Sequence, residues 1–407
     1  MKTSNIRYRL LTALGVSFHL LGVLAHAEAE GIAEKIRINR KGAEEGHPVA
    51  QYNIGYFYET GNGVPKDLKE AVKWYRMAAE QKLAPAQNNL GNCYQNGKGV
   101  PKNPAEAVKW YRMAAEQGNA SAMYNLGNCH FNGIGVDKDQ MKAFKLFRSS
   151  AEKGHANAQF SLGSCYSHGT GVVKDVTEGA KWYRKAADQG HAMAQSNLGL
   201  CYQNGNGVKM DVVKAVGLFR KATDQGLAQA QFNLANCYFF GRGVPVDGDE
   251  SMKWYRKAAD QGFVGAQYNL GLIHQKGEIV EQNADEAANW FMKAALQEHS
   301  GGQFQIGLCY LTGAGIQQNL EEGASWYQKA AEQGYLDAQR NLGHCYAEGY
   351  GVPQDLVKAY MWLDVADRGR EEEAHEGRNK VALRMTPQEI TEAKKLSQEW
   401  KASMNDK

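Results

Sequence analysis

The sequence contains none of the short motifs that mark the common enzyme classes. It has no H-E-x-x-H, C-x-x-C or G-x-S-x-G pattern and no phosphate-binding P-loop. Its eleven histidines are scattered along the chain. These absences favour a non-catalytic protein that uses no metal and no cofactor.

The chain also lacks an excess of charge of either sign. Its 47 Lys and Arg residues stand against 44 Asp and Glu residues, and Lys2, Arg7 and Arg9 are the only charged residues among the first 27. Removing that segment would leave 44 residues of each sign. Binding to nucleic acid or to an anionic membrane needs a basic patch, so the composition argues against both as partners.

Only the N-terminus carries a long apolar run. A basic start precedes the apolar stretch from Leu10 to Leu24, and Ala25-His26-Ala27 offers an A-x-A cleavage site. Residues 1–27 are therefore predicted to be a signal peptide cleaved after Ala27, which places the protein in the periplasm or outside the cell without a membrane span. A short membrane anchor is the alternative, although the run is short and contains His19. Without cleavage, a cytosolic adaptor is the alternative.

What the sequence does contain is a repeat of 36 residues that keeps its register. Glycines recur at one position in eight repeats, and Ala235 takes their place in another; the glycines are Gly55, Gly91, Gly127, Gly163, Gly199, Gly271, Gly307 and Gly343. A fixed period of 20–50 residues indicates a solenoid of stacked units. Because such stacks present long grooves, the repeat favours binding over catalysis.

Each of nine repeats, aligned over residues 47–370, is predicted to form two helices, A and B. Helix A of the second repeat is expected over Ala84–Asn96, and a turn with the pattern Gly-x-Gly-Val follows it. Helix B starts at a position that is always Asp or Asn, the preferred N-cap types. That position holds Asp67, Asn103, Asp139, Asp175, Asp211, Asp247, Asn283, Asn319 and Asp355.

Six of these N-cap residues are followed three positions later by Glu, which indicates capping boxes. A ladder of metal sites is the alternative, but capping explains residue type, spacing and position together. Helix B also carries Trp in seven repeats, where Leu146 and Leu218 stand in twice. Replacement by leucine favours core packing over stacking on a cofactor.

The motif A-x-A-Q-x-N-L-G-x-C-Y, followed by G-x-G-V and W-Y-R-K-A-A-x-Q-G, resembles the Sel1-like repeat family, a relative of the tetratricopeptide repeats. The resemblance implies an all-α, right-handed α/α superhelical solenoid of nine 36-residue helix-turn-helix repeats. It also implies protein–protein contact, often in bacterial envelopes, secretion or host interaction. A cysteine-rich branch of the family is linked to penicillin binding and hydrolysis, so a β-lactam or cell-wall hydrolase is the rival function.

Terminal capping helices are expected at both ends of the repeats. Residues 28–46 contain a degraded helix B, and residues 371–407 are expected to form a C-terminal capping helix and tail. Thr386, Pro387 and Glu389 form an N-terminal helix signal, from which a helix is expected to run to about Trp400. This helix would cover the apolar face of the last repeat.

All seven cysteines occupy one position of the repeat, where Phe57 and Ile273 stand in twice. Replacement by Phe and Ile indicates a buried apolar slot. The cysteine-rich branch has two cysteines per repeat, whereas this chain has one. Equivalent helices of neighbouring repeats should lie about 8–10 Å apart or more, and a disulfide needs Cα atoms within about 7 Å. We therefore expect seven free, buried thiols.

Function is expected on helix A, which lines the concave face of tetratricopeptide-like stacks. One position there forms an asparagine ladder of Asn53, Asn89, Asn125, Asn197, Asn233, Asn269 and Asn341. A primary amide can donate to and accept from a peptide backbone at once, so the ladder could hold an extended chain. The alternative is that each Asn bonds the backbone of the neighbouring repeat and only tightens the stack.

Specificity is expected where helix A varies. Most repeats end helix A in polar residues, whereas the sixth ends it in Phe239-Phe240, and exposed aromatics are typical of binding hot spots. One apolar binding patch is predicted from Phe232, Phe239, Phe240, Tyr268 and Phe304. Packing of Phe239 and Phe240 on the adjacent turn is the alternative.

The seventh repeat is irregular. Its turn reads Gly277-Glu278-Ile279-Val280 without the second glycine, and Glu298 replaces the glycine after helix B. A bend or hinge in the stack and neutral drift are both compatible with this sequence. The sequence as a whole predicts a scaffold that binds protein or peptide, and leaves the partner and the oligomeric state open.

Overall fold

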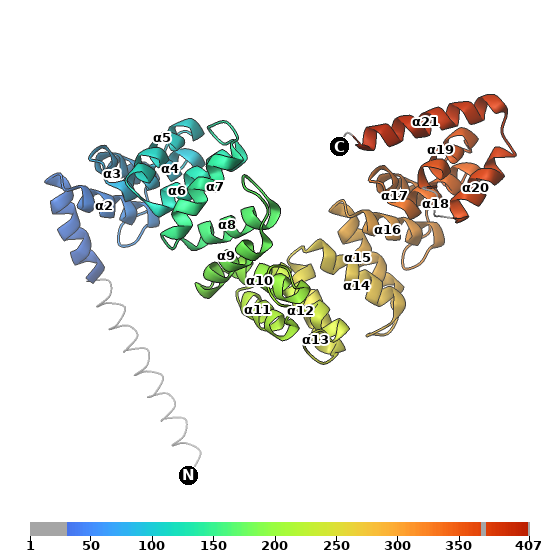
Figure 1. Ribbon diagram of the computed structural model, residues 1–407, viewed down its shortest axis with the longest axis horizontal. Helices are drawn as coiled ribbons and strands as arrows, with labels where there is room; N and C mark the ends of the chain where they lie inside the picture. Colours follow the sequence, from blue (N-terminus) through green and yellow to red (C-terminus); the bar gives the residue numbers. More distant parts are fainter. Residues whose placement is uncertain (1–30, 368–371, 406–407) are drawn as a thin grey trace, which may run out of the picture. The chain divides into compact units, whose positions relative to one another are not determined.

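The computed structural model describes residues 31–367 and 372–405, which form helices joined by short turns, with no β-strand in these ranges. The predicted signal peptide lies outside the described residues. Nine helix pairs follow one another along the chain (Figure 1). The prediction of an all-α solenoid of nine repeats with capping helices is confirmed.

The helices have almost constant length. Helix A of successive repeats is α2 Pro48–Thr60, α4 Ala84–Asn96, α6 Ala120–Asn132, α8 Ala156–His168, α10 Ala192–Asn204, α12 Ala228–Phe240, α14 Val264–Lys276, α16 Ser300–Thr312 and α18 Leu336–Glu348. Helix B is α3 Leu68–Glu80, α5 Pro104–Glu116, α7 Gln140–Glu152, α9 Val176–Asp188, α11 Val212–Asp224, α13 Gly248–Asp260, α15 Ala284–Leu296, α17 Leu320–Glu332 and α19 Leu356–Ala366. The bounds of α4 are those predicted from the sequence.

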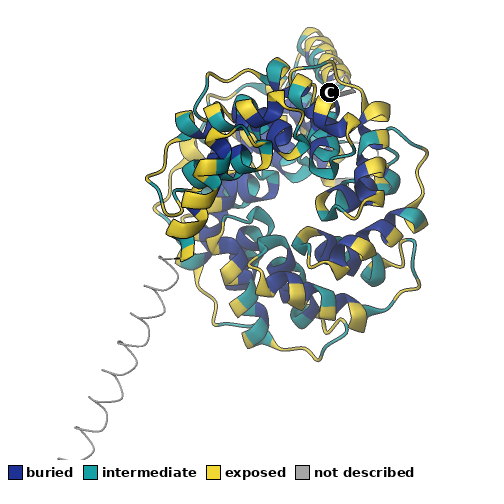
Figure 2. Ribbon diagram, turned by 90° about the vertical axis from the view of Figure 1, so that its left-hand side faces the viewer, coloured by how far each residue is buried: buried dark blue, intermediate teal, exposed yellow. Residues whose placement is uncertain are grey.

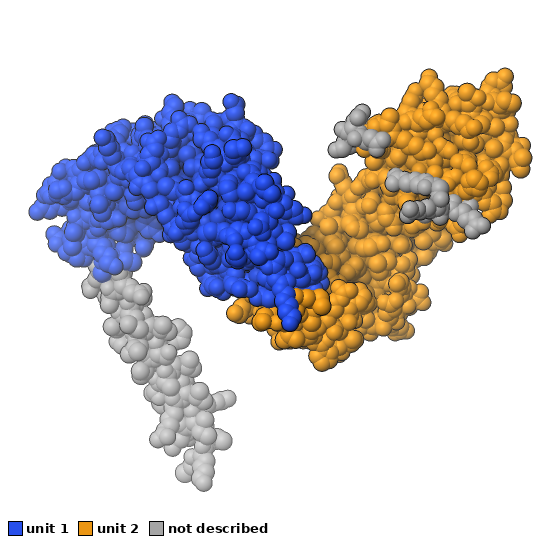
Figure 3. Space-filling model, viewed as in Figure 1, with its two compact units in different colours: residues 1–209 blue, residues 210–407 orange. Residues whose placement is uncertain are grey.

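The chain divides into two compact units, residues 1–209 and 210–407, with the boundary between the two helices of repeat 5 (Figure 3). Within each unit, a helix packs against the helices before and after it. Buried residues lie on the facing sides of the paired helices, and exposed residues gather on the turns (Figure 2). Within each unit, the apolar core is therefore a series of layers between successive helices.

The Asp and Asn residues before helix B are N-caps in all nine repeats. The side chain of Asp67, for example, accepts a hydrogen bond at 3.0 Å from the backbone N–H of Glu70. The equivalent bond forms at the other eight positions. The capping interpretation of this column is confirmed.

The capping box, however, is only half formed in the repeats. The backbone N–H of Asp67 donates to the carbonyl of Tyr58 at 2.9 Å, so it does not need Glu70. The Glu70 carboxylate instead pairs with Lys73 at 2.6 Å, one turn further along the helix. A complete box forms at Thr386, whose backbone N–H donates to Glu389 at 2.7 Å while the N–H of Glu389 donates to the Thr386 hydroxyl at 3.3 Å.

Tight helix packing explains the glycine ladder. A Cβ on Gly91 would lie 2.6 Å from the ring of Tyr111, which is fully buried in helix B of the same repeat. The second glycine of the turn is required for another reason. Gly99 has a φ of 72°, and its Cβ would collide with the carbonyl oxygen of Leu68 in the preceding repeat. Of the tryptophans, Trp182, Trp290, Trp326 and Trp362 are buried. Trp74, Trp110 and Trp254 are half-buried and pack against the apolar core, as predicted.

A buried glutamine on helix A joins neighbouring repeats. Gln87 donates to the carbonyl of Ala79 in repeat 1 at 3.1 Å and accepts from Gln117 in its own repeat at 2.7 Å. The amide is thereby satisfied on both sides, which removes the cost of burying it. This arrangement recurs at Gln267, which bonds Ala259 and Gln297.

Both ends of the solenoid are covered by helices. Residues 31–44 are helical, and Ile36 and Ala43 pack against Ile54 of the first repeat. At the other end lie α20 Glu372–Ala382, which the sequence analysis did not predict, and α21 Pro387–Asn405, which extends beyond the predicted end. Trp400 packs on Trp362 with ring centroids 5.6 Å apart.

A charge reversal fixes the C-terminal cap. Asp364 occupies the position at which Arg184 donates to a tyrosine of the following repeat at 2.6 Å. In the last repeat no such tyrosine follows, and Asp364 accepts hydrogen bonds from Arg378, Ser397 and Lys401 at 2.7–2.9 Å. These bonds lower the pKa of Asp364 against the opposing effect of burial.

All seven cysteines are free, as predicted, and six of them are buried. Cys201 differs from the prediction because it is only half-buried. Burial raises the pKa of every one of these thiols, and that of Cys165 to about 11. The thiols are therefore protonated at neutral pH and act as small apolar side chains.

Candidate functional site

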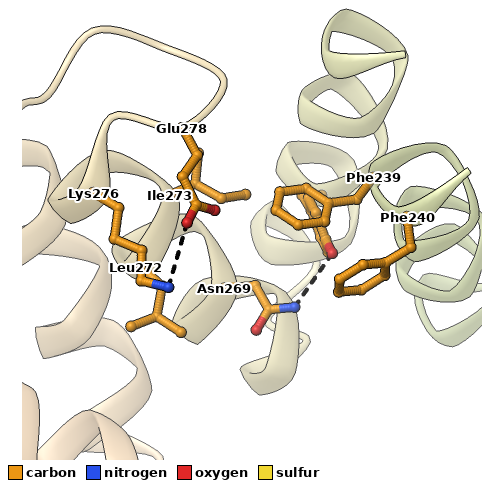
Figure 4. Close-up of a pocket in the computed structure, with 8 residues that line it drawn as sticks. Phe239, Phe240, Asn269, Leu272, Ile273, Lys276 and Glu278 are labelled. Carbon is orange, nitrogen blue, oxygen red and sulfur yellow. Dashed lines mark hydrogen bonds and ion pairs between the residues drawn. The ribbon is translucent and has the colours of Figure 1, made fainter. Parts of the chain in front are cut away.

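A pocket of about 340 Å³ opens between repeats 6 and 7, within unit 2 (Figure 4). Its walls come from the end of α12, from α13, from α14 and from the turn after α14. The lining residues are Phe239, Phe240, Tyr255, Asn269, Leu272, Ile273, Lys276 and Glu278.

The two phenylalanines differ in their surroundings. Phe239 is half-buried and packs with Tyr255 in the core between α12, α13 and α14. Phe240 is 54% exposed and meets the Phe239 ring edge-on, with centroids 4.8 Å apart. The Arg242 guanidinium lies 4.8 Å from the centre of the Phe240 ring. An exposed aromatic ring beside a cation thus stands at the mouth of the pocket.

A short chain of hydrogen bonds forms the polar part of the wall. The Tyr255 hydroxyl donates to the Asn236 carbonyl oxygen at 2.6 Å and accepts from the Asn269 amide at 3.3 Å. Burial raises the pKa of Tyr255 to about 12, although the bond from Asn269 opposes the shift. The hydroxyl therefore stays protonated and positions Asn269 at the pocket.

The irregular turn of repeat 7 borders this pocket. Lys276 and Glu278 form an exposed ion pair at 3.4 Å. Ile279 replaces the second glycine of the turn and faces Gly248, where an added Cβ would lie 2.5 Å from the Ile279 side chain. The missing glycine is thus compensated by a glycine in the preceding repeat, at a position that other repeats fill with larger residues.

A second pocket, of about 210 Å³, lies three repeats earlier in unit 1, between repeats 3 and 4. Its lining residues are Asn128, Phe131, Phe147, Phe160, Ser161, Ser164, Cys165 and Thr170. Phe131, Phe147, Ser161, Ser164, Cys165 and Thr170 correspond to Phe239, Tyr255, Asn269, Leu272, Ile273 and Glu278 in the repeat. The position of Phe240 is Asn132 there, and that of Arg242 is Ile134.

The structure divides the five predicted aromatic residues among three clusters. Phe232 and Phe239 both pack around Tyr255, with Phe240 beside Phe239. Tyr268 packs on Phe291 and His299 in the next cluster. Phe304 packs on Tyr327 and Tyr335 in a third cluster. Of the five, Phe239 and Phe240 line the pocket.

The asparagines of the ladder are half-buried, including Asn89, Asn197 and Asn233. Asn125 donates to Asn88 and Asn92 in the preceding repeat at 2.9 and 3.2 Å. The donation by Asn269 likewise crosses to the preceding repeat. These bonds tighten the stack through side chains, whereas the stacking alternative expected backbone acceptors. Peptide binding by the ladder stays a prediction.

Of the residues that repeat 7 contributes to the pocket, sequence reasoning named Asn269 but missed Leu272, Ile273, Lys276 and Glu278. Leu272 was a weak signal, because its position is Asn, Ser or His in five repeats but also Leu at Leu200 and Leu308. Only the combination of this leucine with Phe239-Phe240 in the preceding repeat marks the two opposite walls.

Apolar side chains make up most of the pocket lining, and few ionisable groups join them. The ionisable groups lining it are Tyr255, which stays protonated, and the paired Lys276 and Glu278. Among residues 31–367 and 372–405, no three His, Cys, Asp or Glu side chains gather as metal binding requires. No described helix combines the length and apolar character needed to cross a membrane.

The repeat architecture defines the class of protein, an α/α solenoid. The Sel1 repeat family matches nine consecutive segments, 48–83, 84–119, 120–155, 156–191, 192–227, 228–263, 264–299, 300–335 and 336–366. This chain belongs to the Sel1 repeat family.

Two solved structures of such proteins are similar over most of their length. One is c5321, a protective antigen of uropathogenic Escherichia coli strains, with 34% identity, a TM-score of 0.55 and coverage of 89% of this chain and 85% of that one. The other is a Sel1 repeat protein from Oxalobacter formigenes, with 32% identity, a TM-score of 0.58 and coverage of 76% and 89%. A comparison with curated proteins gave no match.

Proposed function

We propose that this chain is a non-catalytic scaffold that binds a protein or peptide on its helix-A face, with the pocket between repeats 6 and 7 as the principal contact. The observation that carries the proposal is the exposed Phe240 ring at the mouth of an apolar pocket. Exposed aromatics next to a pocket are typical of binding hot spots, whereas single apolar residues scattered over a surface are ordinary.

The location proposed for this scaffold is the periplasm or the space outside the cell. The basic, apolar and A-x-A segments of residues 1–27 support it. So does the similarity to c5321, because a protective antigen is met by the host. The seven free thiols favour the rival location in the cytosol, where thiols stay reduced.

N-terminal sequencing of the protein from fractionated cells separates the two locations. A mature chain that starts at Glu28 and is recovered outside the cytosol is the expected result. An intact Met1 in the cytosolic fraction would establish the cytosolic adaptor instead.

Binding is tested by affinity capture from envelope and host extracts with the purified chain and its Phe240→Asn variant. Asparagine is the residue of Asn96, Asn132 and Asn204 at the same position, so the variant should keep the fold. Phe239 is left intact because it packs in the core. The matched control is Asn132→Ala, at the same position in repeat 3.

A partner held by the wild type and the control but lost by Phe240→Asn is the expected result. Equal retention by all three proteins would move the contact to another part of the solenoid. If no partner is captured and the purified chain hydrolyses a β-lactam, the enzymatic function replaces the scaffold.

A further inference from the structure

The pocket between repeats 6 and 7 has the size and walls to receive one large apolar side chain. Its volume of about 340 Å³ lies near the lower end of the range for small-ligand pockets. Phe239, Phe240 and Tyr255 present rings, and Leu272 and Ile273 present aliphatic surface. Since Phe239 and Phe240 already meet edge to face, an inserted aromatic ring can continue the same geometry.

The wall also offers a partner for a peptide backbone. Asn269 uses one amide hydrogen on Tyr255, and its group also has a second N–H and a carbonyl oxygen. Backbone N–H and C=O groups that enter with an anchor side chain need such partners, because a buried backbone group without one is costly. An extended segment can therefore follow its anchor into the pocket.

The rim carries more positive than negative charge. Lys276 and Glu278 neutralise each other, whereas no carboxylate of the described residues forms an ion pair with Arg242. The equivalent pocket between repeats 3 and 4 has Ile134, His168 and Thr170 at these three positions. The cationic rim is thus a property of the pocket that also has the exposed phenylalanine.

We propose that the pocket between repeats 6 and 7 binds an aromatic side chain of an extended acidic segment, with a carboxylate of that segment pairing with Arg242. This proposal rests on the proposed function as a protein-binding scaffold, and adds the chemistry of the partner. Rim charges mainly set the rate of encounter and the choice of partner, while the anchor ring sets how long the complex lasts.

The test measures the fluorescence anisotropy of labelled synthetic peptides with the purified full-length chain. One peptide has a single Phe flanked by Asp and Glu, a second has Ala in place of Phe, and a third has Lys in place of the acids. The protein variants are Phe240→Asn and Arg242→Ile, which introduce residue types found at these positions in other repeats. Asn128→Ala, in the pocket between repeats 3 and 4, is the control.

Binding of the acidic Phe peptide, with at least a tenfold loss for the Ala peptide and for Phe240→Asn, is expected. Arg242→Ile should weaken binding several-fold and reduce its dependence on salt. The proposal is overturned if the acidic Phe peptide does not bind at about 1 mM, if the Lys peptide binds better, or if Phe240→Asn binds as well as the control. Should these peptides fail while capture of a partner still depends on Phe240, the scaffold function stands and only the acidic anchor is wrong.

Discussion

The two pockets occupy the same positions of the repeat, three repeats apart, but differ in size and surface. Between repeats 3 and 4 the volume is about 210 Å³, and Ser161, Ser164 and Thr170 make part of the wall polar. Between repeats 6 and 7 the volume is about 340 Å³, with Leu272 and Ile273 in place of Ser164 and Cys165. The repeat fixes the positions that line each pocket. A few substitutions at those positions decide which pocket is apolar.

The strongest test of the shared repeat is to add a methyl group behind each pocket. Gly163→Ala would place a Cβ atom 2.7 Å from the Tyr183 ring. The Cβ atom of Gly271→Ala would collide with the Phe291 ring. Both variants should lose about 1–3 kcal/mol through overpacking. Urea denaturation followed by circular dichroism checks this.

The matched control is Gly217→Ala, a helical glycine with nothing within 4 Å of the added methyl. It should be neutral or stabilise by up to about 1 kcal/mol. A loss in the control as large as that in Gly163→Ala or Gly271→Ala would contradict the packing explanation.

A transfer of side chains tests whether the surface alone distinguishes the pockets. The double variant Asn132→Phe/Ile134→Arg gives repeat 3 the residue types of Phe240 and Arg242. A chain that carries these two substitutions together with Phe240→Asn/Arg242→Ile should regain part of the affinity for the acidic Phe peptide. Its affinity should stay about tenfold below that of the wild type, because the pocket between repeats 3 and 4 is smaller and more polar. Anisotropy measures it, and no recovery at all would show that Leu272 and Ile273 are needed too.

The irregular end of repeat 7 offers a smaller gain in stability. Glu298 has a φ of 60°, at a position where most repeats have glycine. Glu298→Gly should therefore stabilise unit 2 by about 1 kcal/mol, because glycine adopts this left-handed conformation without the steric cost of a Cβ atom. Lys82, with a φ of 62°, is the counterpart in unit 1, so Lys82→Gly should give a similar gain. Unchanged denaturation midpoints in both variants would contradict the prediction that Glu298 and Lys82 are strained.

Acid should destabilise both units by a smaller amount. His130 in unit 1 and His274 in unit 2 are buried, and burial lowers the pKa of each. The unfolded chain takes up these protons near pH 6.5, so stability is complete above that value and falls as the pH drops below it. The expected loss is below about 1 kcal/mol per histidine.

Denaturation midpoints at pH 7.5 and 5.5 check this prediction. His130→Tyr and His274→Tyr introduce the residue type of the other repeats and should reduce the acid sensitivity. His168→Asn, at an exposed position, is the control. A control that removes as much acid sensitivity as the two tyrosine variants would point to other groups.

Local signals made much of the fold readable from the sequence. The Asp67 column, the first glycine of the Gly-x-Gly turn and the apolar stripe of α4 each act within a few residues, so periodicity and capping rules placed the helices. Repetition then confirmed each signal nine times. The single cysteine per repeat correctly indicated free thiols, because a disulfide needs a partner within reach.

The candidate site was readable only in part. Phe239 and Phe240 stood out because they replace polar residues, and both line the pocket, whereas a joint binding patch with Tyr268 and Phe304 stays a prediction. The Tyr268 ring packs on Phe291 of helix B and on His299, the first residue of the next repeat. The Phe304 ring packs in the same way on Tyr327 and Tyr335.

The sequence by itself determined the number of repeats, the ends of helices A and B and the state of the thiols, because these follow from interactions close along the chain. Tertiary structure decided the partner of Glu70, the addition of α20 and the place of the pocket. These depend on groups about one repeat apart, as Phe239 and Leu272 are, or on whether another group has already satisfied a backbone N–H. Packing between neighbouring repeats decides which surfaces stay exposed after the repeats stack. The sequence pattern of a single repeat does not contain that information.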